Sequence, residues 1–296
     1  MKKILIILWS FLSFAGISCA AQPDTEIIKS TSDTLKVATF NVRIRTNSDT
    51  GNTNWKVRKP EVAKLINEFE FDVFGVQELI DKSQEDDLSD LLNSYASVSY
   101  GRDNQEGSKG ERAAIYFLKN RFELLQKGFF FLSETPETVS KGWDAALNRI
   151  CLWTKLKDRV TNKEFYFFNT HFDHIGVVAR RESAKLITRK MEELAGTETV
   201  ICVGDFNADP NDTEFYNTIT TKLKDSRLVS VEKPKGSVGT FNGWEKEKTD
   251  FPESVRIDYL FTQNVKVISY ETINKRFGEN EVPSDHFPVI IRCTTK

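Results

Sequence analysis

Short apolar runs, each bounded by turn-forming residues, recur along the chain from residue 35 to residue 293. Runs of this length that are rich in β-branched and aromatic residues are typical of β-strands. The predicted strands are residues 35–41, 72–77, 95–100, 112–118, 122–131, 149–157, 164–171, 198–204, 256–262, 265–271 and 287–293. The core is therefore expected to be built largely from strands.

Segments with helical periodicity lie between these runs. The clearest are residues 58–70 and residues 177–194, in which apolar side chains recur on one face. Shorter helices are expected at residues 84–93 and 211–223. Strands mixed with helices, without a repeat or a proline-rich linker, predict one α/β or α+β domain over residues 35–296 with more than one sheet.

Several common site types are missing from the sequence. No GxGxxG or GxxxxGK[ST] motif follows a predicted strand, and no GxSxG motif is present. This excludes the common nucleotide-binding folds and the serine-hydrolase elbow. Cys151, Cys202 and Cys293 lie in apolar runs and match no zinc or disulfide spacing. We interpret them as buried thiols.

The first twenty residues have the pattern of an export signal. Lys2 and Lys3 precede an apolar run that is too short to span a membrane, and small residues follow it. We predict a signal peptide at residues 1–20, a polar tether at residues 21–34, and a periplasmic or extracellular protein without a transmembrane span in the mature chain. Both soluble release and a lipid anchor on Cys19 are open.

The charge balance argues against non-specific binding to nucleic acid. The formal net charge is −2, and loss of residues 1–20 would remove two lysines and no acid, which gives −4. Affinity for phosphate backbones depends on clustered Lys and Arg. A basic cleft within an acidic surface is still compatible with this balance.

Polar side chains end or interrupt many of the apolar runs. They are Asn41, Glu78, Asn169, His171, Asp205, Asn207, Asp258, Asp285 and His286. Asn41 and Asp258 are expected in the middle of strands. A buried carboxylate costs several kcal/mol unless it is paired or bound to a metal. We therefore expect the fold to bring these groups together.

Such a set of residues suits metal-assisted hydrolysis. Carboxylate and amide oxygens are ligands for Mg²⁺, Mn²⁺ or Ca²⁺. Glu78 is the first choice as a metal ligand, with Asp285 and Asp205 as candidates beside it. His171 and His286 can act as bases or phosphate donors, whereas His174 is interpreted as a structural residue. Because no activated Ser or Cys is visible, phosphoester hydrolysis fits better than acyl transfer.

The ordered series "TFNVR", "VQE", "NTHFDH", "GDFN", "RIDY" and "SDHFP" resembles the endonuclease/exonuclease/phosphatase superfamily, which includes DNase I-like nucleases, inositol-polyphosphate phosphatases and sphingomyelinases. The resemblance covers residues 35–293. It implies a four-layer αββα sandwich, in which two mostly antiparallel sheets are flanked by helices and a cleft lies at one end.

The resemblance also implies roles for individual residues. Glu78 would be the metal carboxylate, with Asn41 as its polar neighbour. His286 would be the catalytic histidine, paired with Asp258, and Asp285 would lie near metal and phosphate. Asp205 and Asn207 would position the attacking water, and the general base is either His286 or Asp205. His171 would contact phosphate, and Asn41, Asn169 and Arg149 are assigned to substrate binding.

Two features bear on the branch of the superfamily. Arg43 stands where abasic-site endonucleases carry an acid, which puts a second metal ligand in doubt and argues against DNA repair. The segments "KGWDAALNR" and "ARRES", which include Trp143, Arg149, Arg180 and Arg181, are more similar to the nocturnin-like branch. Through this resemblance Arg149 could meet a substrate phosphate; packing and a solvated helix start are an equal alternative for these four residues.

The sequence thus predicts an exported, Mg²⁺-dependent hydrolase of a phosphodiester or phosphomonoester, with Mn²⁺ or Ca²⁺ as alternative ions. Its substrate would be a small phosphorylated molecule or a nucleic acid, and no protein partner is inferred. The alternative is a non-catalytic envelope protein that binds a phosphorylated ligand in the same cleft.

Overall fold

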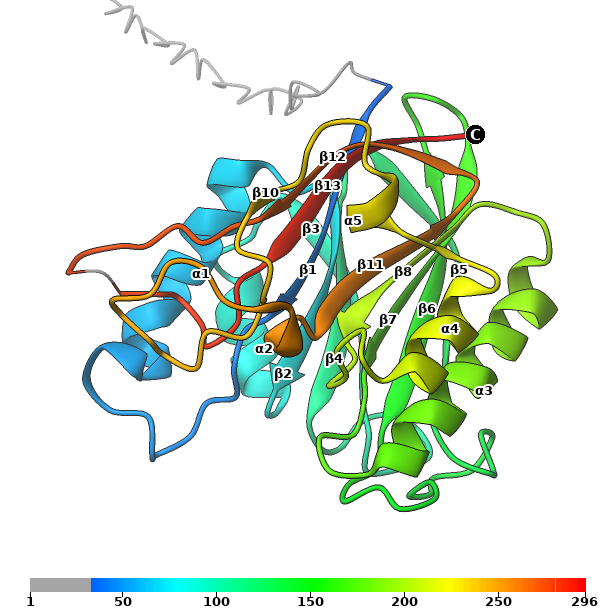
Figure 1. Cartoon of the computed structure of the whole chain (residues 1–296), viewed down its shortest axis with the longest axis horizontal. Coiled ribbons are helices and arrows are strands. Elements are labelled where there is room, and N and C mark those ends of the chain that lie inside the picture. The colour runs from blue at the N-terminus through cyan, green and yellow to red at the C-terminus, as the bar shows by residue number, and fades with distance from the viewer. Residues whose placement is uncertain (1–32, 280) are drawn as a thin grey trace, which may run out of the picture.

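A computed structural model describes residues 33–279 and 281–296. The predicted signal peptide, Cys19 and nearly all of the predicted tether lie outside the described residues. Two β-sheets form the centre of the molecule, with helices on the outside (Figure 1).

The first sheet has seven strands in the order β10-β12-β13-β1-β2-β4-β3. In chain order they are β1 (Leu35–Asn41), β2 (Val73–Leu79), β3 (Tyr95–Gly101), β4 (Arg112–Leu118), β10 (Lys235–Gly236), β12 (Val265–Thr272) and β13 (Val289–Thr295). Strand β1 runs parallel to β2 and antiparallel to β13. The first sheet is therefore mixed at its centre.

The second sheet has six strands in the order β5-β6-β7-β8-β11-β9. They are β5 (Phe122–Phe131), β6 (Ile150–Asp158), β7 (Glu164–His171), β8 (Val200–Asp205), β9 (Lys224–Asp225) and β11 (Asp258–Gln263). Strand β7 is parallel to β8, and β8 is antiparallel to β11. The remaining pairs in this sheet are antiparallel.

Helices cover both outer faces. Helices α1 (Trp55–Phe69) and α2 (Lys82–Ser89) lie beside the first sheet, and α3 (Val177–Ala195) and α4 (Thr213–Thr220) lie beside the second (Figure 1). The side chains of Asn54, Asp81 and Asp212 each accept a backbone N–H at the start of α1, α2 and α4. Three single-turn elements complete the fold, namely α5 (Ser226–Val229), η1 (Gly51–Thr53) and η2 (Glu253–Val255).

The alternation of side chains along the strands explains the layers. On β8, Ile201 and Val203 point into the core between the sheets, whereas Cys202 faces the helices. On β1, Val37 lies between the sheets and Ala38 faces α1 and α2. Both faces of each central strand are thus apolar and buried, as a sheet covered on both sides requires. The predicted αββα sandwich is confirmed.

The long elements agree with the prediction, but two details do not. Asn41 is the last residue of β1 and Asp258 is the first residue of β11, so neither lies in the middle of a strand. Both therefore sit where a strand meets a loop and can face a cleft. The three buried cysteines are free thiols, as predicted.

The two sheets approach each other closely at Gly75 on β2. A Cβ at this position would lie 2.5 Å from Val203 Cγ2 and 2.6 Å from Asn169 Oδ1 of the opposite sheet. Only glycine allows this approach without displacing the second sheet. In the part of the chain that the structure describes, no helix is both long and apolar enough to cross a membrane.

Candidate active site

The ends of five central strands meet at one edge of the sandwich. Strands β1 and β2 are parallel, so Asn41 and Glu78 lie at the same edge of the first sheet. Strands β7 and β8 are also parallel, which places His171 beside Asp205. Strand β11 is antiparallel to β8 and begins at this edge, and its Asp258 pairs with Asp205. The topology therefore gathers polar residues from five strands.

Asn41 joins the two sheets through its amide group. Its Nδ2 donates to Glu78 Oε1 and to Asp205 Oδ2, both at 2.9 Å. Glu78 has a φ of 64°, next to a register irregularity between β2 and β4, and its Oε2 accepts from the backbone of Ile44 at 3.0 Å. A non-glycine residue in this region of φ is strained, and such strain is common at functional sites. Asn41 thus holds two carboxylates side by side.

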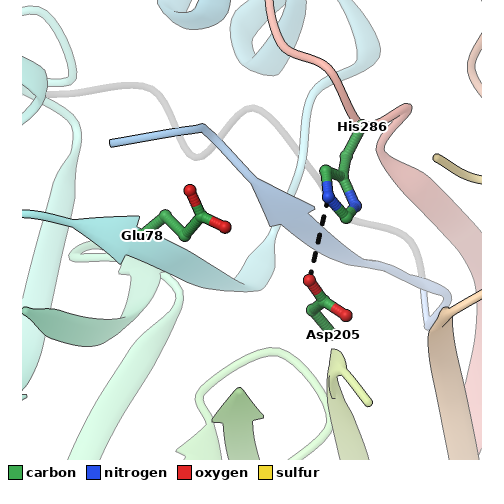
Figure 2. A group of neighbouring side chains, drawn as sticks. All are labelled: Glu78, Asp205 and His286. Carbon is green, nitrogen blue, oxygen red and sulfur yellow. Dashed lines mark ion pairs between the residues drawn. The ribbon is translucent and has the colours of Figure 1, made fainter. Parts of the chain in front are cut away.

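Three of these side chains could hold a metal ion. Glu78, Asp205 and His286 each offer one ligand atom, and these atoms all lie within 4.8 Å of one another. Figure 2 shows Glu78 on β2, Asp205 at the end of β8 and His286 on the loop before β13, with Asp205 and His286 joined by an ion pair. Asp285, predicted as a ligand, lies outside this group of three.

His286 is oriented by Asp258. Its Nδ1 lies 2.9 Å from Asp258 Oδ2, which also accepts from Thr240 Oγ1 at 2.6 Å. Its Nε2 faces Asn41 Nδ2 at 3.5 Å and Asp205 Oδ2 at 3.8 Å. Burial disfavours the charge on this ring, but Asp258 and Asp205 outweigh burial and raise the pKa of His286 well above its ordinary value.

The site is rich in buried negative charge. Asp205, Asp258 and Asp285 are all at most 6% exposed. Burial and the neighbouring Asp258 raise the pKa of Asp205, and burial raises that of Asp285. Ionised carboxylates that are buried this close together favour a cation among them. The residues therefore fit a divalent metal ion, with Glu78 and Asp205 as oxygen ligands.

The other predicted residues lie around this centre. His171 Nε2 is 3.6 Å from Asp205 Oδ2, and burial and Arg149 lower the pKa of His171 to about 3, so its ring is neutral. The backbone N–H of Asn207 donates to Asp205 Oδ1, and its side chain donates to the carbonyl of Phe172. Both residues are thus fixed beside Asp205.

Arg43 lies at the rim of this cluster. Its guanidinium makes an ion pair with Asp49, with Nε and Oδ2 3.3 Å apart, and its Nη1 lies 3.6 Å from Asp285 Oδ2. A cation therefore already faces Asp285. This agrees with the expectation that a second metal ligand is doubtful at Arg43.

Asn169, which we assigned to substrate binding, has a different position. Its side chain is fully buried between the sheets, where Nδ2 donates to the carbonyls of Val76 and Ala114, and Oδ1 accepts from Gln77 Nε2. Because all its polar hydrogens and its oxygen are used inside the protein, Asn169 joins the sheets and does not face a substrate. The sequence pattern could not distinguish these roles.

His174, which we interpreted as a structural residue, lies beside Arg149. It is exposed, and its Nδ1 lies 3.1 Å from Arg149 Nη2. Arg149 is buried and Asp173 lies 3.4 Å from its Nε. Sequence reasoning missed Asp173, although it lies within "NTHFDH". It also missed Thr240, which contacts Asp258, and Glu111, whose Oε1 lies 3.2 Å from His171 Nδ1, because no motif gave a signal for either.

Asp173 holds together two loops beside the site. Its carboxylate accepts from the backbone N–H groups of Ala146, Leu147, Ile175 and Gly176. Burial alone would raise the pKa of Asp173, but the hydrogen bonds from Gly176 and Ala146 outweigh burial and lower it. The loop that carries Arg149 is thereby fixed against the start of α3.

We expect Asp173→Asn to destabilise the protein by about 3 kcal/mol at pH 7, because charge-assisted hydrogen bonds are lost. A carboxylate whose pKa is lowered by folding stabilises the folded protein at pH values above its unfolded pKa of about 3.9. This stabilisation is lost as the pH falls through the folded pKa. The difference from wild type should therefore shrink below about pH 4. Urea unfolding of both proteins at pH 7 and pH 3.5 measures this, and an equal difference at both pH values would contradict it.

The comparisons with known proteins agree with this geometry. A model of the "Endonuclease/Exonuclease/phosphatase family" matches residues 38–286. The chain belongs to this family. The family's members are phosphoester-hydrolysing enzymes that depend on divalent metal ions, so this chain is a hydrolase of phosphoester bonds. This favours an enzyme over the non-catalytic alternative.

Solved structures of other endonuclease/exonuclease/phosphatase family members have the same fold. A family protein from Bacteroides thetaiotaomicron is 38% identical, with a TM-score of 0.82 over 89% of this chain and 98% of that one. A mannosyl-6-phosphatase from Bacteroides thetaiotaomicron is also 38% identical, with a TM-score of 0.81 over 88% of this chain and 99% of that one.

A more distant family relative is nocturnin of Drosophila melanogaster. It is 23% identical over 278 residues, which cover 80% of this chain and 41% of nocturnin. The catalytic domain of human nocturnin shares the fold, with a TM-score of 0.67 at 18% identity over 89% of this chain and 94% of that one. The resemblance to the family is confirmed, and nocturnin is among the relatives.

Proposed function

We propose that this protein is an exported, Mg²⁺-dependent phosphoesterase that hydrolyses a phosphodiester or phosphomonoester by water attack. The observation that carries this proposal is the position of His286, held by Asp258 through one ring nitrogen and facing Asp205 with the other. Such an oriented imidazole beside carboxylates is suited to proton transfer at a phosphoryl group.

The proposed roles follow from the contacts. His286 Nε2 and Asp205 Oδ2 lie 3.8 Å apart, so a single water in the cleft would contact both atoms, give its proton to one and be oriented by the other. Asn41, with its Nδ2 between the same groups, and Asn207 would fix Asp205 and donate toward the developing negative charge. The neutral ring of His171, which also faces Oδ2 of Asp205, would contact the phosphoryl oxygens.

Glu78 and Asp205 would hold the metal ion. Carboxylate oxygens suit Mg²⁺, and Mn²⁺ is also compatible with them. A bound divalent ion would neutralise the carboxylates and polarise the phosphoryl group. Ca²⁺ is the weaker alternative, because it prefers six to eight oxygen ligands.

A small phosphorylated molecule is the proposed substrate. A net charge of −2 gives little attraction to a long nucleic-acid backbone. A relative that is 38% identical is a mannosyl-6-phosphatase, which supports a phosphorylated sugar as one candidate. The proposal of export, with soluble release or an anchor on Cys19, rests on the pattern of residues 1–20.

A panel assay on residues 22–296 tests the proposed function. The panel contains sugar phosphates, inositol phosphates, nucleotide mono- and diesters, single-stranded DNA and RNA, and sphingomyelin, each with Mg²⁺, Mn²⁺ or chelator. We expect Mg²⁺-dependent hydrolysis of a sugar phosphate or another small phosphoester. Cleavage of nucleic acid alone would overturn the substrate class, and equal rates in chelator would overturn the metal requirement.

A further inference from the structure

We infer that Arg149 forms a second oxyanion-binding subsite next to the catalytic cluster, so that the preferred substrates carry a second anionic group, a phosphate or a carboxylate, beside the scissile phosphate. This inference rests on the proposed function and narrows its substrate class. It is carried by the contacts of one buried arginine.

Arg149 is 4% exposed and uses few of its donors. Its Nε is 3.4 Å from Asp173 Oδ2, and its Nη2 donates to His174 Nδ1 at 3.1 Å. Among the described residues, nothing accepts a hydrogen bond from its Nη1. A guanidinium has five N–H donors in a planar fork that matches an oxyanion. A buried arginine whose Nη1 donates no hydrogen bond is therefore suited to receive a ligand.

The position of Arg149 separates it from the scissile phosphate. Glu111 Oε1 lies 3.2 Å from His171 Nδ1 and 3.9 Å from Arg149 Nη1. The other nitrogen of His171, Nε2, faces Asp205 at 3.6 Å. Because Nδ1 and Nε2 point to opposite sides of the ring, His171 stands between Arg149 and the catalytic carboxylates. A group bound at Arg149 is thus distinct from the phosphoryl group bound at Asp205.

The donors of Arg149 favour an anion. Arg102 Nη1 lies 2.8 Å from Glu111 Oε1, and Arg149 lies beside both Glu111 and Asp173, so two carboxylates balance the charge of two buried arginines. The guanidinium donors that make no hydrogen bond within the protein, rather than a surplus of positive charge, would therefore bind an oxyanion. The catalytic cluster, in contrast, is dominated by carboxylates and repels anions when no metal ion is bound.

His174 covers the subsite on the solvent side. Arg149 can only donate, so Nδ1 of His174 accepts and the ring is in its neutral form in this contact. The side chain is exposed, and an entering oxyanion would replace it at Nη2 while pairing with Nη1. Bidentate binding of this kind is typical of arginine with phosphate or carboxylate.

Calorimetric titration of the protein in chelator with inorganic phosphate tests the subsite without catalysis. We expect Arg149→Met to weaken phosphate binding about tenfold or more, because charge-assisted hydrogen bonds are lost. Glu111→Gln should strengthen it at least about threefold, because a nearby negative charge is removed. Arg181→Met is the control, since Arg181 is paired with Asp212 and Glu214 at the surface, and should bind phosphate like wild type.

Unchanged binding in Arg149→Met, or no gain in Glu111→Gln, would overturn the subsite, and the second variant decides if the first does not fold. Titration with acetate distinguishes a carboxylate from a phosphate ligand. With Mg²⁺, Arg149→Met should lower kcat/KM at least about tenfold more for a sugar bisphosphate than for the monophosphate. If no substrate is hydrolysed, the proposed function is wrong, but the subsite is still tested, because the titration in chelator needs no turnover.

Discussion

Replacing His286 with asparagine should lower kcat by about 10³-fold, because the oriented imidazole is lost from the reacting group. His286 is held at 2.9 Å by Asp258 and faces Asp205, and the shorter amide of asparagine cannot reach both. The measurement is steady-state kinetics on the best substrate of the panel, with kcat and KM determined separately. We expect the loss mainly in kcat, since His286 acts on the transition state.

Thermal unfolding in chelator provides the control for His286→Asn. The variant removes a partner of a buried carboxylate, so its melting temperature should fall, but a single cooperative transition should remain. A folded variant that retains more than a tenth of wild-type kcat would show that His286 does not act in the reaction.

Glu78→Gln should abolish the effect of Mg²⁺ on both stability and turnover. The substitution keeps the shape but removes the charge of the main metal ligand, which we expect to cost about 4 kcal/mol, or about 10³-fold in rate. Wild type should melt at a higher temperature as Mg²⁺ is added, because a ligand of the folded state stabilises it. The variant should show no such rise.

The metal-free proteins give an independent check on Glu78→Gln. Both oxygens of Glu78 accept hydrogen bonds, and the nearby histidines and the hydrogen bond from Asn41 outweigh burial and lower its pKa in the folded protein, so loss of its charge should lower the metal-free melting temperature. Glu70→Gln is the matched control, because Glu70 is exposed and pairs with Lys36 far from the cluster. A Mg²⁺-induced rise that persists in Glu78→Gln would contradict its role as a metal ligand.

Most of the fold could be predicted from local sequence patterns. A strand that is buried on both faces has apolar residues throughout, and a helix has them at a period of 3.6, so the long elements were found. Strands β9 and β10 and helix α5 span only two to four residues. Elements that short have no period to detect, and they form only because neighbouring strands and loops provide their partners.

The catalytic candidates were also visible, because polar residues at the ends of apolar strands are unusual. The sequence indicated Glu78, Asp205 and His286 one by one. They lie close together because of the strand order. The parallel pairs β1–β2 and β7–β8 end at one edge of the sandwich, and the antiparallel strand β11 begins there. Asn41 and Asp205 are 164 residues apart, so no local pattern could show that one amide joins them.

By itself, the sequence determined the family, the layers and the acidic residues of the candidate site, since these depend on side-chain periodicity and on motifs in a fixed order. Only the tertiary structure decided that Asn169 lies in the core, that Asp173 holds two loops, and that Nη1 of Arg149 donates no hydrogen bond beside the site. The physical reason is that hydrogen bonding and burial depend on which groups from distant segments fill the same space. A polar residue at the end of a strand has the same local sequence pattern whether it is buried in the core or faces the active site.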